Sequence, residues 1–136
     1  MTDRPDLIAQ ALIDHLKASA TVLAELPDDN EIREEEWQGT NFTYPNIRVR
    51  ITNLGLYEIG AQCLNSPFDA HVLVFSEEPF SSQANRIAGI IKTVLHDKSF
   101  SQNGLLVALR ATIIPAIRSD DRTWRSEVLL RGVVSG

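Results

Sequence analysis

The chain has 136 residues and a mass of 15.1 kDa, which fits one domain with a single core. Hydrophobic residues make up 43% of it and charged residues 23%, a composition typical of globular rather than disordered proteins. Because 18 Asp and Glu outnumber 13 Lys and Arg, the net charge is −5. This acidity argues against a general nucleic-acid binder and against docking on anionic lipid.

The sequence gives no indication of secretion or of a membrane anchor. No apolar run approaches the roughly 18 residues that a membrane span needs, and the polar start of the chain predicts no signal peptide. The single cysteine, Cys63, excludes an internal disulfide framework and a cysteine-based zinc cluster. It has no base or cation beside it in the sequence, so we expect a small buried side chain and not a nucleophile. Synthesis in a reducing cytoplasm fits these features.

The first periodic segment, residues 5–26, places its apolar side chains on one side of a helix and its polar side chains on the other. Pro5 suits the first turn, and Leu26-Pro27 with the polar residues after it ends the segment. Ser19 and Thr21 are weak helix formers. The sequence therefore predicts an amphipathic helix that breaks near these two residues.

Strand patterns follow the helix. Residues 32–37 are highly charged and predict a short edge strand, while residues 56–64 predict a further strand after a turn. Between them, the apolar side chains of residues 47–51 alternate with Arg48 and Arg50. This is the clearest strand pattern in the chain, with one buried face and one polar face.

The middle of the chain predicts a central strand and a second helix. Residues 69–76 carry apolar side chains on both faces, which is typical of a strand inside a sheet. Ser81 or Ser82 can cap a helix that extends to residue 97 with one apolar face.

The last third of the chain predicts two long strands, residues 105–114 and 124–134, joined by residues 115–123. Residues 99–104 are expected to form a loop, and Trp124 is expected to close an edge of the core. Strands come in groups and do not alternate with helices, so the predicted class is α+β. We expect a mainly antiparallel sheet of four to five strands with two helices packed on one face. The other face, with its arginines, is then exposed to water or covered by a partner.

Catalytic and metal-binding motifs are missing from the sequence. The three histidines are His15, expected at the core boundary, His71 on a strand, and His96, expected on the solvated side of the second helix. No pair has the spacing that holds a metal ion. The chain also contains no nucleophile elbow, phosphate-binding loop or dinucleotide fingerprint. We expect no catalytic residue, cofactor-binding residue or metal ligand.

Acidic residues stand next to one another at two places in the chain, Glu34-Glu35-Glu36 and Asp120-Asp121. Successive residues on a strand point to opposite faces, so the three glutamates do not converge on one substrate. A solvated edge that discourages unwanted strand pairing is the simplest interpretation of the first group. A solvated turn is the simplest interpretation of the second.

Aromatic side chains gather before the clearest strand: Trp37, Phe42 and Tyr44. Loop aromatics either close the edge of a core or anchor a partner, and the sequence leaves both alternatives open. If they anchor a partner, we expect Arg48 and Arg50 on the adjacent strand to pair with acidic groups of that partner.

The order and local composition of several segments match a known pattern. The matching segments, in chain order, are residues 32–39, 42–45, 47–51, 75–77, 81–84 and 118–124. Over nearly the whole chain this layout resembles the tail terminator, or tail completion, proteins of long-tailed bacteriophages and phage-like gene transfer particles. No catalytic signature defines that family, so the resemblance is one of pattern.

The resemblance implies a structural protein of the virion that is not an enzyme and needs no cofactor. Copies of such proteins form a ring, commonly a hexamer, on the last ring of the tail tube. The ring stops tube polymerisation and presents the surface to which the head connector attaches, and DNA passes through its centre. The implied partners are other copies, the tail tube protein and the head connector, with no membrane.

An acidic net charge suits a channel through which DNA slides without sticking. Our hypothesis is that one acidic group faces the lumen or the tube, the candidates being Glu34, Glu35, Glu36, Asp120 and Asp121. The candidates for contacts with a neighbouring copy or the tube protein are Trp37, Phe42, Tyr44, Arg48 and Arg50.

Alternatives from other classes remain. Another connector, neck or tail-tube component shares the size and compartment of a tail terminator. A small-molecule-binding α+β domain predicts a closed apolar pocket with convergent polar groups. An enzyme built on residues distant in sequence predicts that His71, Asp69 and Glu127 meet in a cleft.

Overall fold

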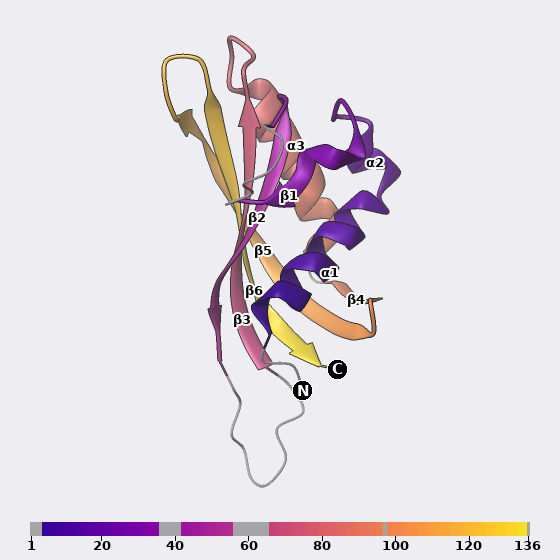
Figure 1. Cartoon of the computed structure of the whole chain (residues 1–136). Coiled ribbons are helices and arrows are strands. Elements are labelled where there is room, and N and C mark those ends of the chain that lie inside the picture. Colours follow the sequence, from indigo (N-terminus) through magenta and orange to yellow (C-terminus); the bar gives the residue numbers. More distant parts are fainter. Residues whose placement is uncertain (1–3, 36–41, 56–65, 97, 136) are drawn as a thin grey trace, which may run out of the picture.

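The computed structural model describes residues 4–35, 42–55, 66–96 and 98–135. Its centre is a six-stranded sheet with the strand order β1-β2-β3-β6-β5-β4 (Figure 1). The strands are β1 (Ile32–Glu34), β2 (Asn46–Leu54), β3 (Ser66–Ser76), β4 (Lys98–Gln102), β5 (Leu105–Arg118) and β6 (Trp124–Ser135). The short β1 pairs parallel to β2, and the other neighbours pair antiparallel. The predicted α+β class is confirmed, and β3 occupies the central position that its two apolar faces predicted.

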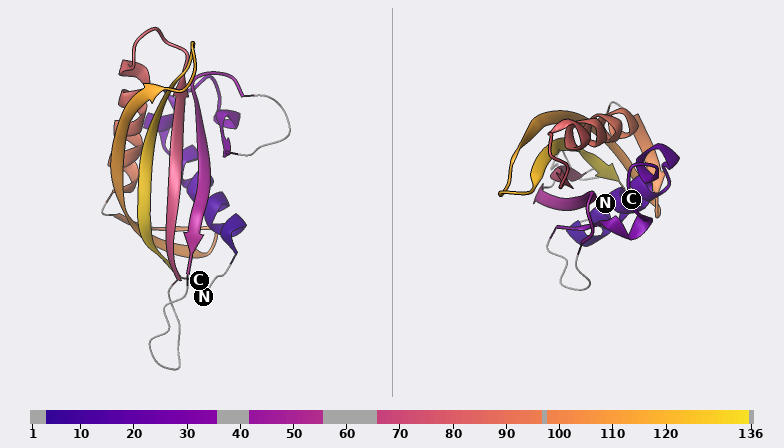
Figure 2. Two further views of the ribbon diagram at one scale, coloured as in Figure 1. Left: turned by 90° about the vertical axis from the view of Figure 1, so that its left-hand side faces the viewer. Right: turned by 90° about the horizontal axis from the view of Figure 1, so that it is seen from above.

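The helices lie on one side of this sheet. They are α1 (Pro5–Lys17), the short α2 (Ala20–Leu23) and α3 (Ser82–Leu95), with a 3₁₀ turn at Asp29–Glu31. Helix α1 packs on β1, β2 and β4, and α3 packs on β3, β5 and β6. None of the described helices covers the opposite face, which is turned toward the viewer in the left view of Figure 2. The predicted one-sided arrangement of two main helices is confirmed.

The predicted break in the first helix lies where expected. Helix α1 ends at Lys17, and the hydroxyl of Ser19 accepts the backbone N–H of Val22 at 3.4 Å to cap α2. Helix α3, which corresponds to the second predicted helix, begins after Ser81, but the Ser81 side chain makes no capping hydrogen bond. Instead the backbone carbonyl of Ser81 accepts the N–H of Asn85, so the position was predicted correctly and the capping bond was not.

The sheet has more strands than predicted because residues 99–104 do not form a loop. Residues 98–102 form β4, which pairs with β5 up to the Gln102–Leu105 pair. Asn103 and Gly104 make the turn between them with φ values of 54° and 81°. These left-handed values are what a two-residue hairpin turn needs, and Asn-Gly is its strongest sequence signal. The predicted strand at 56–64 lies outside the described residues.

Strand β5 continues beyond its predicted end at residue 114. The pairing register with β6 shifts between Ile114 and Ile117, at Pro115, which has no N–H to donate. Side chains satisfy the backbone groups at this bulge: Ser126 donates its hydroxyl to the Ile114 carbonyl (3.1 Å), and Asn85 accepts the Ala116 N–H (2.8 Å). Ile114 and Ile117 consequently both face away from the helices, with 40% and 52% of their surface exposed.

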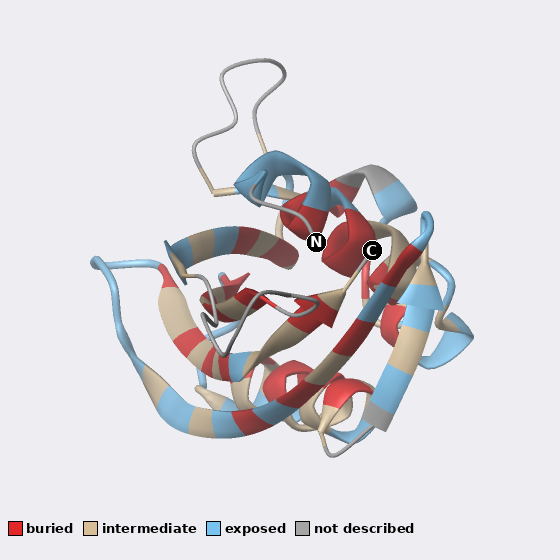
Figure 3. Cartoon of the chain, turned by 90° about the horizontal axis from the view of Figure 1, so that it is seen from below, coloured by how far each residue is buried: buried red, intermediate tan, exposed pale blue. Residues whose placement is uncertain are grey.

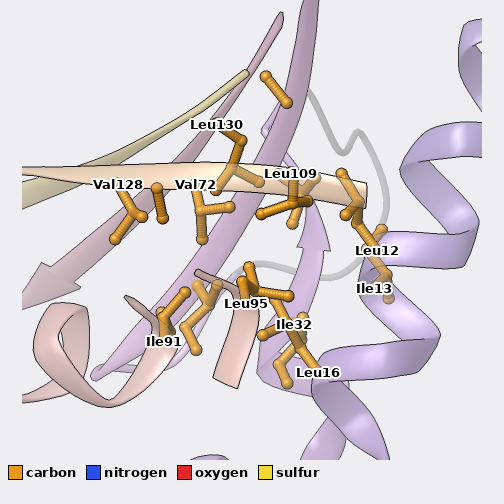
Figure 4. Close-up of a cluster of buried hydrophobic side chains, with 14 of the residues drawn as sticks. Leu12, Ile13, Leu16, Ile32, Val72, Ile91, Leu95, Leu109, Val128 and Leu130 are labelled. Carbon is orange, nitrogen blue, oxygen red and sulfur yellow. The ribbon is translucent and has the colours of Figure 1, made fainter. Parts of the chain in front are cut away.

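The core lies between the helices and the sheet. Bands of buried and more exposed residues alternate along the strands in Figure 3, as a sheet with one covered face requires. Apolar side chains of α1 and α3, such as Leu12 and Ile91, point toward Val72, Val128 and Leu130 of the central strands (Figure 4). Each such side chain contributes about 1.5–3 kcal/mol when it is fully buried. The core therefore fixes the sheet against the helices and leaves its other face uncovered.

Candidate functional site

The face of the sheet opposite the helices is rich in arginine. We call this surface the open face; it comprises Arg48, Arg50, Asp69, His71, Arg110, Thr112, Arg125, Glu127, Leu129 and Arg131. Arg48 and Arg50 lie there because they alternate with the buried Ile47 and Val49 on β2, as their spacing predicted. Five guanidinium groups outnumber the two carboxylates of this set, even when Glu35 beside Arg50 is added, so the face is positive in a chain of net charge −5.

Phe42 packs against the arginines of its own fold. The guanidinium carbon of Arg33 lies 4.3 Å from the centre of the Phe42 ring, and that of Arg48 lies 4.4 Å from it. Arg48 also lies 4.0 Å from the ring of Phe75. These cation–π contacts favour the interpretation of Phe42 as a residue that closes the edge of the fold. Tyr44 is half-buried, and Trp37 lies outside the described residues.

A buried carboxylate, which the sequence analysis did not single out, holds the Phe42 segment in place. Glu31 is only 3% exposed. Its two oxygens accept a hydrogen bond from Arg33 (3.0 Å) and one from the backbone N–H of Thr43 (2.7 Å). This carboxylate therefore joins the start of β1 to the chain just after Phe42.

The first acidic group is divided between two environments. Glu34 is exposed at the edge strand β1, whereas Glu35 pairs with Arg50 on the open face at 3.5 Å. Glu36 lies outside the described residues. The alternation that argued against convergence of these carboxylates on one substrate is seen at Glu34 and Glu35.

The second acidic group forms part of the turn between β5 and β6. One carboxylate oxygen of Asp120 accepts the backbone N–H groups of Arg122 (2.8 Å) and Thr123 (2.9 Å). The hydrogen bond from Arg122 is the main reason why the pKa of Asp120 lies below its ordinary value. Asp121 is exposed, and its backbone carbonyl accepts a hydrogen bond from Arg118 (2.7 Å). Both residues occupy the solvated turn that the sequence predicted.

We expect the variant Asp120→Ala to lose part of the pH dependence of stability. A carboxyl whose pKa is lowered by folding stabilises the native state above its unfolded pKa of about 4, and this contribution disappears as the pH falls through the lower folded pKa. Urea unfolding should therefore show a deficit for Asp120→Ala at pH 7 that shrinks toward pH 2. Asp121→Ala removes a neighbouring charge and serves as the control. Equal pH profiles for the two variants would show that Asp120 does not hold the turn.

A His–Glu contact and an Arg–Asp ion pair lie side by side on the open face. Nδ1 of His71 is 3.4 Å from a carboxylate oxygen of Glu127, and Nε of Arg131 is 3.0 Å from the carboxylate of Asp69. Of the three residues that the enzyme alternative brings together, His71 and Glu127 are in contact, whereas Asp69 pairs with Arg131. In the described ranges, no group of three or more His, Cys, Asp or Glu side chains could hold a metal ion.

The other two histidines have structural contacts. The His15 ring stacks on Phe100 with 3.7 Å between ring centres, at the core boundary where it was expected. The prediction of a solvated His96 was wrong. This residue ends α3, is half-buried, and its Nδ1 accepts the backbone N–H of Ala111 on β5 at 2.9 Å. The helix wheel could not show this contact, because a strand distant in sequence supplies the donor.

A hollow of about 460 Å³ lies on the open face. Thr52, Thr112 and Leu129 line it together with the charged side chains of Arg110 and Arg131. Because the side chain of Arg131 is 87% exposed, the hollow is a surface feature and differs from the closed apolar pocket that a small-molecule-binding domain predicts.

Among the described helices, none is both long enough and apolar enough to span a bilayer.

Two connections between elements, the β3–α3 loop and the β5–β6 turn, lie at the end of the molecule at the top of Figure 1. We call this end the tip; it comprises the β3–α3 loop, residues 77–81, and the β5–β6 turn, residues 119–123. Phe80 is 76% exposed there. Trp124 supports the loop from the sheet side, since its indole N–H donates to the Pro79 carbonyl at 3.4 Å while its ring lies 4.9 Å from Arg118. Trp124 thus acts as the predicted edge plug, whereas the exposure of Phe80 was not predicted.

This arrangement occurs in solved structures. The chain superposes on a chain from the virion of a native gene transfer agent particle with a TM-score of 0.78 and 11% sequence identity, covering 99% of this chain and 100% of that chain. The two chains share a fold. A second solved structure superposes with a TM-score of 0.63 and 17% identity, covering 99% of this chain and 98% of its own. No family model and no curated protein sequence matches the chain.

Proposed function

We propose that the chain is a structural protein of a tailed, phage-like particle. In this role a ring of copies, six by the family pattern, caps the tail tube, ends its polymerisation and forms the joint to the head connector. The protein would be made in the host cytoplasm and would reside in the virion at the end of the tail next to the head. It acts by binding and has no catalytic step.

One observation carries this proposal. The fold matches a chain of a gene transfer agent virion over 99% of this chain and all of the other. This likeness of fold agrees with the independent resemblance of the sequence to tail terminator proteins of phages and gene transfer particles. At 11% identity the likeness concerns the fold, so the terminator role rests on both arguments together.

The uncovered face of the sheet supports a role in assembly. A cyclic ring is built from heterologous contacts, in which one surface of a copy meets a different surface of the next. The open face and the tip are two such different surfaces on one chain. Among the acidic candidates for the lumen, Glu34 and Asp121 are exposed, whereas the carboxylates of Glu35 and Asp120 are engaged within the chain.

Electron microscopy of tails assembled with and without the protein tests the proposal. We expect tubes of uniform length when the purified protein is present and overlong, irregular tubes when it is absent. Labelled protein should decorate one end of each tube only. Labelling along the whole tube would indicate a tail-tube subunit, and binding only to finished tails without any effect on their length would indicate a neck component; either result would contradict the terminator role.

A further inference from the structure

Two arginines face each other across strands on the open face. Arg110 of β5 and Arg131 of β6 are directly opposed in the pairing register. Like charges at directly opposed positions destabilise a sheet. Asp69 offsets part of this repulsion through its 3.0 Å contact with Arg131. This pair places two guanidinium groups from neighbouring strands beside the hollow of the open face.

The hollow beside these arginines fits an aromatic ring. Its volume of about 460 Å³ exceeds that of one side chain, and its lining includes the methyl-bearing Thr52 and Thr112 and the apolar Leu129. Arg110 and Arg131 belong to the same lining. A ring seated there would be flanked by two guanidinium groups, which is a favourable arrangement for a π-system.

The chain itself carries a fitting ring at its tip. Phe80 has the largest exposed fraction, 76%, among the exposed large hydrophobic residues of the described chain. Glu77 and Glu78 precede it and are both exposed, so the ring lies beside negative charge. Because Trp124 holds the Pro79 carbonyl, the loop presents the ring from a supported backbone.

We propose that Phe80 of one copy inserts between Arg110 and Arg131 on the open face of a second copy, while Glu77 and Glu78 of the first copy meet these guanidinium groups. The fold already uses this chemistry within one chain, where the guanidinium of Arg48 lies close to two phenyl rings. The contact combines a cation–π interaction with charge-assisted pairing.

This contact joins two different surfaces, so it propagates from copy to copy and closes into a ring when the rotation between copies permits. The biological meaning of this contact rests on the proposed function, because the contact names the two surfaces that would form the ring. The exposed apolar residues Leu106 and Ile114 on the same side of β5 favour a protein partner over nucleic acid. The carboxylates of Asp69 and Glu127 on the open face would also repel phosphate.

Charge reversal tests which surfaces meet. The face variant carries Arg110→Glu and Arg131→Glu, and the tip variant carries Glu77→Lys and Glu78→Lys. We expect wild-type protein to self-associate in sedimentation velocity at low salt and each variant alone to be monomeric, with at least a tenfold weaker association. A mixture of the two variants should associate again, because the acidic face of one variant now meets the basic tip of the other. Circular dichroism checks that every variant is folded.

Matched controls separate this contact from general charge effects. Arg4→Glu with Lys17→Glu changes the net charge as much as the face variant does, but at the two ends of α1 on the helix side of the molecule, and should leave association unchanged. Phe80→Ala should weaken association by roughly 30-fold or more, as removal of a central aromatic anchor does. Leu7→Ala, at the exposed Leu7 of α1, should have no effect.

Three outcomes would overturn the inference. They are a wild-type protein that stays monomeric at millimolar concentration, variants that associate like the wild type, and a mixture that fails to restore association. If instead the face variant loses affinity for an oligonucleotide while it keeps self-association, the open face binds nucleic acid and the inference is wrong. These measurements use no tail tubes, so they test the contact between copies separately from the control of tail length. Either proposal can therefore fail while the other stands.

Discussion

The variant Gly132→Ala is expected to be about 3 kcal/mol less stable than the wild type, the upper end of the usual cost of overfilling a packed site. Gly132 lies on β6 opposite Leu109 of β5. A Cβ atom at this position would overlap the backbone carbonyl oxygen of Ala108 and lie 2.7 Å from the Cβ of Leu109. The obstacle includes rigid backbone of the neighbouring strand, so the sheet must distort to admit the methyl group. Urea unfolding measures the difference in the free energy of unfolding.

The variant Gly89→Ala provides the matched control. Gly89 lies inside α3, and a Cβ there would meet nothing within 4 Å. Alanine has a higher helix propensity than glycine, so this variant should be more stable by about 0.5–1 kcal/mol. The same chemical change is thus expected to have opposite effects at two positions. A Gly132→Ala protein as stable as the wild type would show that β5 and β6 do not approach so closely.

The second large effect is expected at the buried ion pair of Glu31 and Arg33. Their side chains are 4% and 11% exposed. The variant Arg33→Ala leaves the Glu31 carboxylate without its cation, and breaking a buried pair in this way costs about 3–5 kcal/mol. It also removes one of the two guanidinium groups that pack on Phe42. Urea unfolding should therefore show a stability loss beyond that of an exposed arginine, for which Arg86→Ala is the control.

A double-mutant cycle separates the charge from the packing. In the Arg33→Ala background, Glu31→Gln replaces the stranded carboxylate with a neutral amide that can still accept the Thr43 N–H. We expect this second substitution to restore part of the lost stability, although in the wild type it is destabilising. Strictly additive effects would mean that Glu31 and Arg33 are not coupled.

The positions of most helices and strands follow from the local spacing of apolar residues. Helices α1 and α3 and strands β2, β3 and β6 lie where their apolar spacing predicted, because burial on one side imposes a period of 3.6 residues on a helix and 2 on a strand. The one-sided sheet was equally predictable, since two helices cannot cover both faces. Strand β4 was not predicted although Asn103-Gly104 carries a hairpin signal, because Phe100 is the one apolar residue within its five positions.

Residues whose contacts come from other parts of the chain were harder to predict. Glu31 carries no local sign of burial, since its partner Thr43 belongs to a segment twelve residues further along the chain and only Arg33 is close in sequence. His96 looked solvated on its helix because Ala111, the residue that donates to it, lies on β5. The exposure of Phe80 depends on the loop supported by Trp124 and not on its own neighbours in the sequence.

The order of amino acids by itself determined which side chains face the core and that one face of the sheet stays bare, because these depend on spacing within single elements. Only the tertiary structure decided which side chains of that bare face are neighbours. Arg110 stands opposite Arg131, and Arg48 lies between Phe42 and Phe75, because strand order and register bring them together. Such pairings are non-local, and the pattern of one strand contains no information about the register of the next.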